Sequence, residues 1–313
     1  MKLYNSDEPL KDISSTGKER PWRKKKLLNL KLAELYENID SRKATRLNNC
    51  ATCLTFQQFE DGSRKIKYVN SCKVRLCPLC SWRRSLKVHH HMNMIMHEIE
   101  KEKEYGYLFL TLTIRNVFPD ELNDAITNMM QGFKDLMANK QVKKIAKGWY
   151  RGLEITYNEQ DNTYHPHFHV VVAVNKSYFK KTDYLNRQQW TELWRNSMDL
   201  SYTPIVNVKR VKGNTTEAIS NIARYTVKDS DYIRQDNLEL SEEIVRVLDK
   251  ALHKRRLIAY GGIFKQVHRR LRLDEEENKA NSKTDEDDNA VRISYAWNVG
   301  LGNYYLKNQE YDY

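Results

Sequence analysis

The sequence of 313 residues predicts an α+β fold, with an antiparallel β-sheet that carries helices on one side. Two patterns carry this prediction. Alternating apolar residues between 107 and 174 mark strands, two of which follow each other as a hairpin, while segments of helical period separate the others. A third pattern, five cysteines between 50 and 80, indicates a separate cysteine-rich segment before the sheet.

The N-terminal part of the chain is expected to be a basic arm and a helix. The first 30 residues are polar and then strongly basic, and are interpreted as a flexible arm or a solvated tail. Residues 31–46 have helical periodicity, and a second helix is predicted over 83–103, after the cysteines.

The central segments alternate between strand and helix signals. Residues 107–114 (YLFLTLTI) place Leu108, Leu110 and Leu112 on one face of a strand. Strands are further predicted at 149–157 and 167–174, which flank a polar turn, and at 205–211, whereas helices are predicted at 120–137, 187–197 and 216–228. This order, β-α-β-β-α-β-α, is typical of an α+β architecture.

The C-terminal part combines a predicted helix at 240–257, an acidic linker near 274–290 that is expected to be disordered, and a terminal strand or two at 294–306. The predicted domains are therefore the arm and helix at 1–46, the cysteine-rich region at 47–100, the sheet domain at 101–235 and a C-terminal region at 236–313.

Composition indicates a globular protein, and its basic charge leaves two interpretations open. Hydrophobic residues make up 40% of the chain and charged residues 30%, and no apolar run of about 18 residues predicts a membrane span. The start has no apolar segment of signal-peptide type, so we expect a cytoplasmic protein. The net charge of +12 favours binding to phosphates, although solubility alone is an alternative explanation.

Histidines gather in the run His165-Pro-His-Phe-His169. Residues two apart in a strand share a face, so His167 and His169 project together. If the hairpin turns near residue 161, Glu154 lies opposite them and completes a set of two imidazoles and one carboxylate. Such a set suits Mg²⁺ or Mn²⁺ in phosphate chemistry, with Zn²⁺ as an alternative. Histidines that cap a strand or face solvent are the competing interpretation, and His165 is expected in an outer shell or a loop.

The predicted helix at 216–228 carries a tyrosine on its polar face. Its apolar stripe consists of Ala218, Ile219, Ile222, Ala223 and Thr226. Tyr225 lies opposite this stripe, next to Arg224 and one turn before Lys228. Cations favour the phenolate of a side chain whose pKa is usually about 10. An ordinary surface tyrosine is the alternative, and only the histidine cluster argues against it.

Together these segments resemble the rolling-circle replication initiators of small Gram-positive plasmids, in the HUH endonuclease superfamily and closest to the pUB110 and pC194 type. Residues 109–116 resemble the first motif of that family, 165–169 followed by three valines the metal-binding second motif, 224–232 the third motif with Tyr225 as nucleophile, and 70–87 the cysteine-rich segment. The four motifs occur in the order of the family and span most of the chain.

The resemblance implies a metal-dependent nicking and joining enzyme for DNA. His167, His169 and Glu154 would hold a divalent metal at the scissile phosphate, and Tyr225, assisted by Lys228, would form a 5′-phosphotyrosine and release a 3′-OH. The partners implied are the double-stranded plasmid origin, single-stranded at the nick, and a host helicase and polymerase. A homodimer stays open, because the sequence does not determine the oligomeric state.

One position departs from the family pattern. Relatives commonly place a glutamate four residues before the tyrosine, where it can activate water, and this chain has Asn221 there. Glu217 lies one further turn away, about 12 Å from Tyr225 by helical rise, which is far for a substitute. Tyr232 could be a second acceptor, although packing is its favoured role. The departure leaves a non-catalytic, zinc-containing DNA-binding regulator as the alternative, whereas no feature favours a relaxase or transposase.

The cysteines have the spacing of a structural zinc site. Cys50-x-x-Cys53 and Cys77-x-x-Cys80 suit tetrahedral Zn²⁺, and Cys72 is a fifth candidate that could replace one of the four. Disulfides are rare in the cytosol. The alternative to a zinc site is therefore a set of reduced cysteines buried in a core. The cations near this segment, which we expect to contact origin DNA, are Arg75, Arg83, Arg84 and Lys87.

Overall fold

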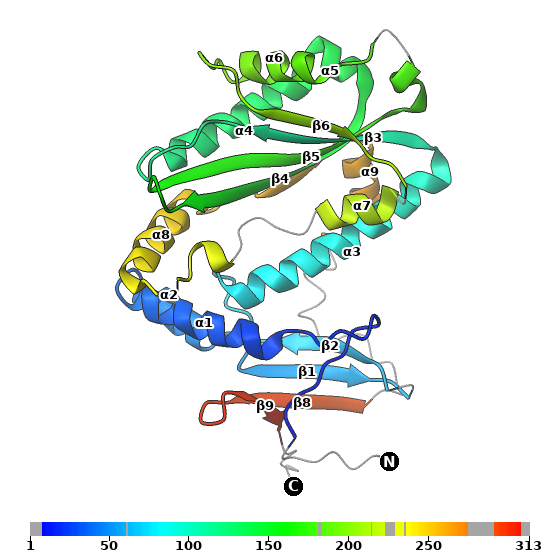
Figure 1. The fold of residues 1–313 in the computed structure, drawn as a ribbon. Helices are drawn as coiled ribbons and strands as arrows, with labels where there is room; N and C mark the ends of the chain where they lie inside the picture. Colours follow the sequence, from blue (N-terminus) through cyan, green and yellow to red (C-terminus); the bar gives the residue numbers. More distant parts are fainter. Residues whose placement is uncertain are drawn as a thin grey trace. The chain divides into compact units, whose positions relative to one another are not determined.

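The structure, a computed structural model, describes residues 8–60, 62–180, 183–213, 215–222, 229–234, 236–274 and 291–307 (Figure 1). The chain forms two compact units. The second unit, Arg83–Asp274, is continuous, whereas the first combines the described residues before Arg83 with those from 291 onward. The predicted boundaries at 46, 100 and 235 do not coincide with this division, because strand pairing joins segments that are distant in sequence.

In its described residues, the first unit contains helices and a four-stranded antiparallel sheet of order β2-β1-β8-β9. Its elements are α1 (Trp22–Glu37), α2 (Ser41–Asn48), β1 (Cys53–Gln58), β2 (Arg64–Val69), β8 (Val291–Asn298) and β9 (Asn303–Leu306). Leu54 of β1 lies opposite Tyr295 of β8, which confirms the predicted return of the chain as terminal strands. The hairpin of β1 and β2 was not predicted, because polar residues occupy most of it.

The interpretation of the first 30 residues as an arm or a solvated tail is wrong for the part that the structure describes. α1 begins at Trp22, and the carboxylate of the buried Asp12 accepts hydrogen bonds from the Trp22 indole and the Arg20 guanidinium, both at 2.7 Å. The predicted single helix at 31–46 is likewise two helices, because Asp40 caps α2 through the Lys43 amide. Tertiary packing therefore orders a segment whose charge suggested solvent.

The second unit is built on a five-stranded antiparallel sheet of order β6-β3-β5-β4-β7. Its strands are β3 (Tyr105–Thr113), β4 (Ala146–Asn158), β5 (Thr163–Asn175), β6 (Val206–Arg210) and β7 (Ile258–Gly261). Its helices are α3 (Pro78–Glu102, which begins in the first unit), α4 (Leu122–Ala138), α5 (Lys140–Ile145), η1 (Lys176–Lys180), α6 (Arg187–Ser197), α7 (Thr215–Ile222), η2 (Asp229–Asp231), α8 (Leu238–Ala251) and α9 (Gly262–Arg270). The structure confirms the α+β class.

Helices cover both faces of this sheet, which corrects the expectation of helices on one side (Figure 1). On one face, Phe168 of β5 packs against Phe133 of α4 and Trp194 of α6. On the other, Val171 and Ala173 of β5 belong to a core with α3, α7 and α9. Residues 170–174 of β5 are all apolar and all buried. A strand that is covered on both faces has such a continuous apolar run in place of alternating apolar and polar residues.

The edge strand β7 extends the sheet beyond β4, and helix α9 follows it in the chain. Neither element was predicted. Gly262 joins them with φ of +53°, and a Cβ atom there would collide with the carbonyl oxygen of Lys147. Only glycine combines this left-handed backbone with such a close approach. The predicted helix at 240–257 ends earlier, at Ala251, because the chain turns towards β7.

Candidate functional site

The hairpin of β4 and β5 brings together the three predicted metal ligands. The strands pair antiparallel with Glu154 directly opposite His167 and Gly152 opposite His169. Because alternate residues share a face, Glu154, His167 and His169 all project to the same side of the sheet. The placement predicted from the turn is therefore confirmed.

The three side chains lie close enough to share one ion. Their ligand atoms all lie within 4.8 Å of one another. His169 Nε2 lies 2.7 Å from Glu154 Oε2, and His167 Nε2 lies 3.6 Å from the same oxygen. The two imidazole rings stand at 88° with centroids 4.8 Å apart, and the His169 ring stacks on Phe109 of β3. The nitrogen atoms and the carboxylate thus converge from three positions on two strands.

The hydrogen bonds behind this group orient the His167 ring. A carbonyl oxygen can only accept, so Nδ1–H of His167 donates to the carbonyl of His165 at 3.1 Å. In its neutral form, which is the form that binds a metal, this ring has its lone pair on Nε2, the atom that faces Glu154. His165 Nδ1 lies 2.9 Å from the Asn116 side-chain oxygen, and the Asn116 amide donates to Thr163. His165 therefore lies on β5 beside His167, outside the three-residue ligand group, and not in a loop.

The electrostatics of the group suit a cation. Burial raises the pKa of Glu154, but hydrogen bonding to His167 and His169 and the charge of these rings outweigh burial and lower this pKa to about 2, from an ordinary 4.5. Burial, and then the neighbouring His167, lower the pKa of His165. The group consists of one carboxylate and two imidazole rings. This donor set fits Mg²⁺, Mn²⁺ or Zn²⁺ with positions left open.

The predicted nucleophile helix is described only in part. α7 contains Glu217 and Asn221, and Ile219 of the predicted apolar stripe is fully buried in the core. Tyr225 and Lys228 lie outside the described residues. Tyr232 is 1% exposed, in agreement with a packing role.

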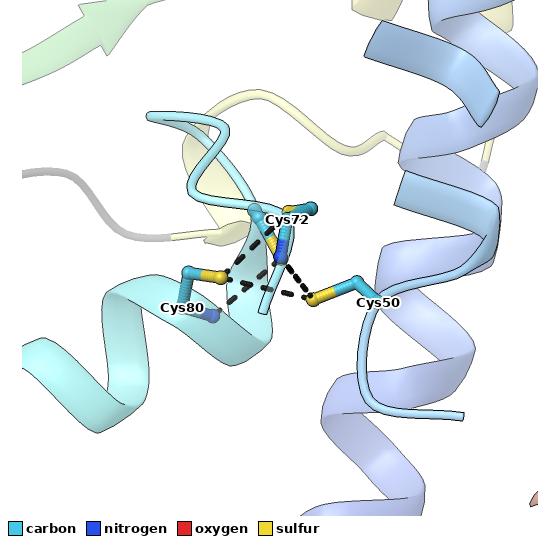
Figure 2. Close-up of side chains that lie close together, drawn as sticks. Cys50, Cys72 and Cys80 are labelled. Carbon is cyan, nitrogen blue, oxygen red and sulfur yellow. Dashed lines mark hydrogen bonds between the residues drawn. The ribbon is translucent and has the colours of Figure 1, made fainter. Parts of the chain in front are cut away.

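The cysteine group differs by one residue from the set that spacing favoured. Cys50, Cys72, Cys77 and Cys80 have sulfur atoms within 4.8 Å of one another, and Figure 2 shows three of these side chains converging. Cys53 is not in the group, because it begins β1 and pairs with Ala296 of β8. The chain turns between Cys50 and Cys53, and Cys72 takes the fourth place.

The four predicted DNA-binding cations are all partly exposed. Arg83, Arg84 and Lys87 lie on α3 in the second unit, and Arg75 precedes this helix in the first unit. Trp82, beside them in sequence, packs edge-on against Trp22 at 4.8 Å.

No helix in the described ranges combines the length and apolar character that a bilayer crossing requires.

Several residues at these two sites were not found by sequence reasoning. Asn116 was predicted only as the last residue of a motif, although its side chain contacts His165. Lys26 and Asn29, which border the cysteine group, lie in the segment interpreted as an arm. The only available signal was the spacing of Trp22, Lys26 and Asn29 on one helical face, which basic neighbours obscured.

Fold and site together define an α+β protein that presents a histidine–histidine–glutamate group on an antiparallel sheet. Comparison with known proteins agrees with this class. A family model described as "Replication protein" matches residues 63–306. Protein rep of Bacillus amyloliquefaciens is 40% identical, over 97% of this chain and 100% of that protein. Protein rep of Streptococcus pneumoniae is 36% identical over 98% of each chain.

A replication protein of Staphylococcus aureus is 37% identical over 63% of this chain and 88% of its own. No solved structure matches the chain. The chain belongs to the replication-protein family, and its four motifs place it with the rolling-circle initiators that they resemble.

Proposed function

We propose that this protein starts rolling-circle replication of a plasmid by cutting one strand of origin DNA and later rejoining it. The observation that carries the proposal is the convergence of Glu154, His167 and His169 on one face of the sheet, in a member of the replication-protein family. Phosphodiester transfer needs a group that neutralises charge on the phosphate, and these side chains are suited to hold it.

A divalent cation bound by this group would polarise the scissile phosphate. The chain itself supplies the orientation of the ligands. The His165 carbonyl fixes the His167 tautomer, and Phe109 holds the His169 ring. Nε2–H of His169 donates to Glu154, and a cation held by these residues would take the place of this proton, which would be released to solvent.

Tyr225 is the proposed nucleophile. Its phenol oxygen attacks phosphorus, the bond to the 3′ oxygen breaks, and the proton lost by the phenol is balanced by one gained by the departing 3′-OH. Lys228, three residues further on in the sequence, is the residue proposed to stabilise the phenolate. The 5′-phosphotyrosine conserves the bond, so a 3′-OH can reverse the reaction without ATP.

The test is covalent capture of DNA. The full chain is incubated with Mn²⁺ and an oligonucleotide of the origin strand labelled on the 3′ side of the nick, and a denaturing gel shows whether label stays on the protein. We expect an adduct that is lost in Tyr225→Phe and kept in Tyr232→Phe. Peptide mapping of the adduct identifies the tyrosine.

The competing function is a DNA-binding regulator without turnover, which the Asn221 departure favours. Binding of the origin with no adduct at any Mn²⁺ concentration would support the regulator and reject the proposed enzyme. An adduct that survives Tyr225→Phe would keep the enzyme and reject the assigned nucleophile.

A further inference from the structure

The cysteine group is assembled from three segments of the first unit. Cys50 follows α2, Cys72 follows β2, and Cys77 and Cys80 lie at the start of α3. The sulfur atoms of Cys50 and Cys77, of Cys50 and Cys80, and of Cys72 and Cys80 are each 3.7 Å apart. A disulfide requires about 2.05 Å, so these thiols are reduced.

The spacing of the sulfur atoms matches a tetrahedral metal site. Zinc–sulfur bonds are about 2.3 Å long, and in a regular tetrahedron the ligands are about 1.63 times that distance apart, or about 3.8 Å. Four thiols in van der Waals contact could have a similar spacing. The distances are therefore compatible with a bound metal and with four packed thiols. The surrounding hydrogen bonds and charges distinguish the two.

Amide N–H groups point at three of the sulfur atoms. The Cys72 amide donates to Cys50 Sγ at 3.3 Å, the Val74 amide to Cys72 Sγ at 3.4 Å, and the Cys80 amide to Cys77 Sγ at 3.5 Å. Lys73 has φ of +58°, which turns the chain so that the Val74 amide returns to the preceding cysteine. Thiolates accept such bonds far better than thiols, so the backbone is arranged around negative sulfur.

A buried cation lies beside the same group. Lys26 of α1 is completely buried, and its ammonium donates to the carbonyls of Cys50 at 2.7 Å and Asn48 at 2.9 Å. Asn29, one turn further on, donates its side-chain amide to Cys77 Sγ at 3.3 Å. In the part of the chain that the structure describes, Lys26 forms no ion pair with a carboxylate.

A buried ammonium with only neutral acceptors is costly unless an anion lies near it. Four thiolates around Zn²⁺ carry a net charge of about −2, and one ammonium would halve it. A cluster of neutral thiols offers Lys26 no such partner.

We propose that Cys50, Cys72, Cys77 and Cys80 bind one structural Zn²⁺ ion as thiolates, with Lys26 as the buried counter-cation and Asn29 as a hydrogen-bond donor to the centre. All four positions around the metal are filled by sulfur, so the site is closed to water and substrate. Its effect is to join α2, the loop after β2 and the first turn of α3, and Cys53 takes no part.

Metal content of matched serine variants tests the ligand set. Full-length chains are purified under reducing conditions in the His167→Ala background, which removes the other metal group, and zinc and iron are counted by mass spectrometry. We expect about one zinc ion per chain in the parent and in Cys53→Ser, and a loss of at least about tenfold in Cys72→Ser.

Cobalt provides a second readout that does not depend on the variants folding. Co²⁺ added to the metal-free parent is expected to give the intense absorption of a tetrahedral cobalt–thiolate centre, and zinc should displace it. Zinc retained in Cys72→Ser but lost in Cys53→Ser, iron in place of zinc, or no cobalt–thiolate absorption in the parent would each overturn the proposal. None of these readouts uses nicking activity, so failure of the enzyme proposal is distinguishable.

Discussion

Replacing Glu154 by glutamine tests the metal group of the central sheet most directly. The substitution keeps the size of the side chain and a carbonyl oxygen that can still accept from His169, but it removes the only carboxylate of the group. The fold should therefore survive while the affinity for a divalent cation falls.

The magnitude follows from the position of this carboxylate. Its side chain is 13% exposed, so solvent screens it only partly. A divalent cation and a carboxylate 4 Å apart attract by about 8 kcal/mol at an effective dielectric constant of about 20, and desolvation cancels most of this energy. We therefore expect the binding free energy of the cation to weaken by about 2.8 kcal/mol. At 1.4 kcal/mol per tenfold, this is a loss of roughly 100-fold in affinity.

The assay is formation of the DNA adduct as a function of Mn²⁺ concentration, combined with direct Mn²⁺ binding by calorimetry. We expect the half-saturating concentration to rise roughly 100-fold in Glu154→Gln, with recovery of the adduct at high Mn²⁺. The matched control is Glu159→Gln at the tip of the same hairpin, where the carboxylate is 54% exposed and pairs with Arg234. An unchanged half-saturating concentration in Glu154→Gln would exclude this residue as a ligand.

Three further substitutions test the framework of the two sites. Trp194→Phe leaves the buried Thr113 carbonyl without its indole donor at 2.8 Å and should lower the free energy of unfolding in urea by about 2 kcal/mol; a loss below about 0.5 kcal/mol contradicts this. Gly262→Ala forces a side chain into a left-handed, crowded position and should cost about 3 kcal/mol, seen as a lower melting temperature. Lys26→Met removes the counter-cation and should speed the loss of zinc to a chelator about tenfold. The control Lys31→Met, at an exposed position of the same helix, should leave this rate unchanged. Equal rates in the two variants would reject the assigned role of Lys26.

Local pattern was sufficient for the elements that carry the histidine group. The alternation of Leu108, Leu110 and Leu112 predicted β3, and a polar turn between two apolar runs predicted the hairpin. Register follows from the turn, so the position of Glu154 opposite His167 could be inferred without any tertiary information.

Long-range packing explains what could not be predicted. The burial of Lys26 depends on contacts with Asn48 and Cys50, which no local pattern reveals. The spacing of Cys50 and Cys53 indicated a ligand pair, but the start of β1 at Cys53 separates them. The sequence likewise cannot show which face of the sheet α3 covers, since α3 precedes all five strands of that sheet.

The first unit combines two segments that are far apart in sequence, and this affects the order of folding during synthesis. β8 and β9 are translated after the whole of the second unit, yet β1 needs β8 as its neighbour in the sheet. The second unit can therefore fold on the ribosome before β8 is synthesised. During this time β1 and β2 form a hairpin in which the edge of β1 is unpaired. Synthesis that stops before residue 291 would yield a chain whose sheet domain is complete but whose cysteine-rich unit is prone to aggregate.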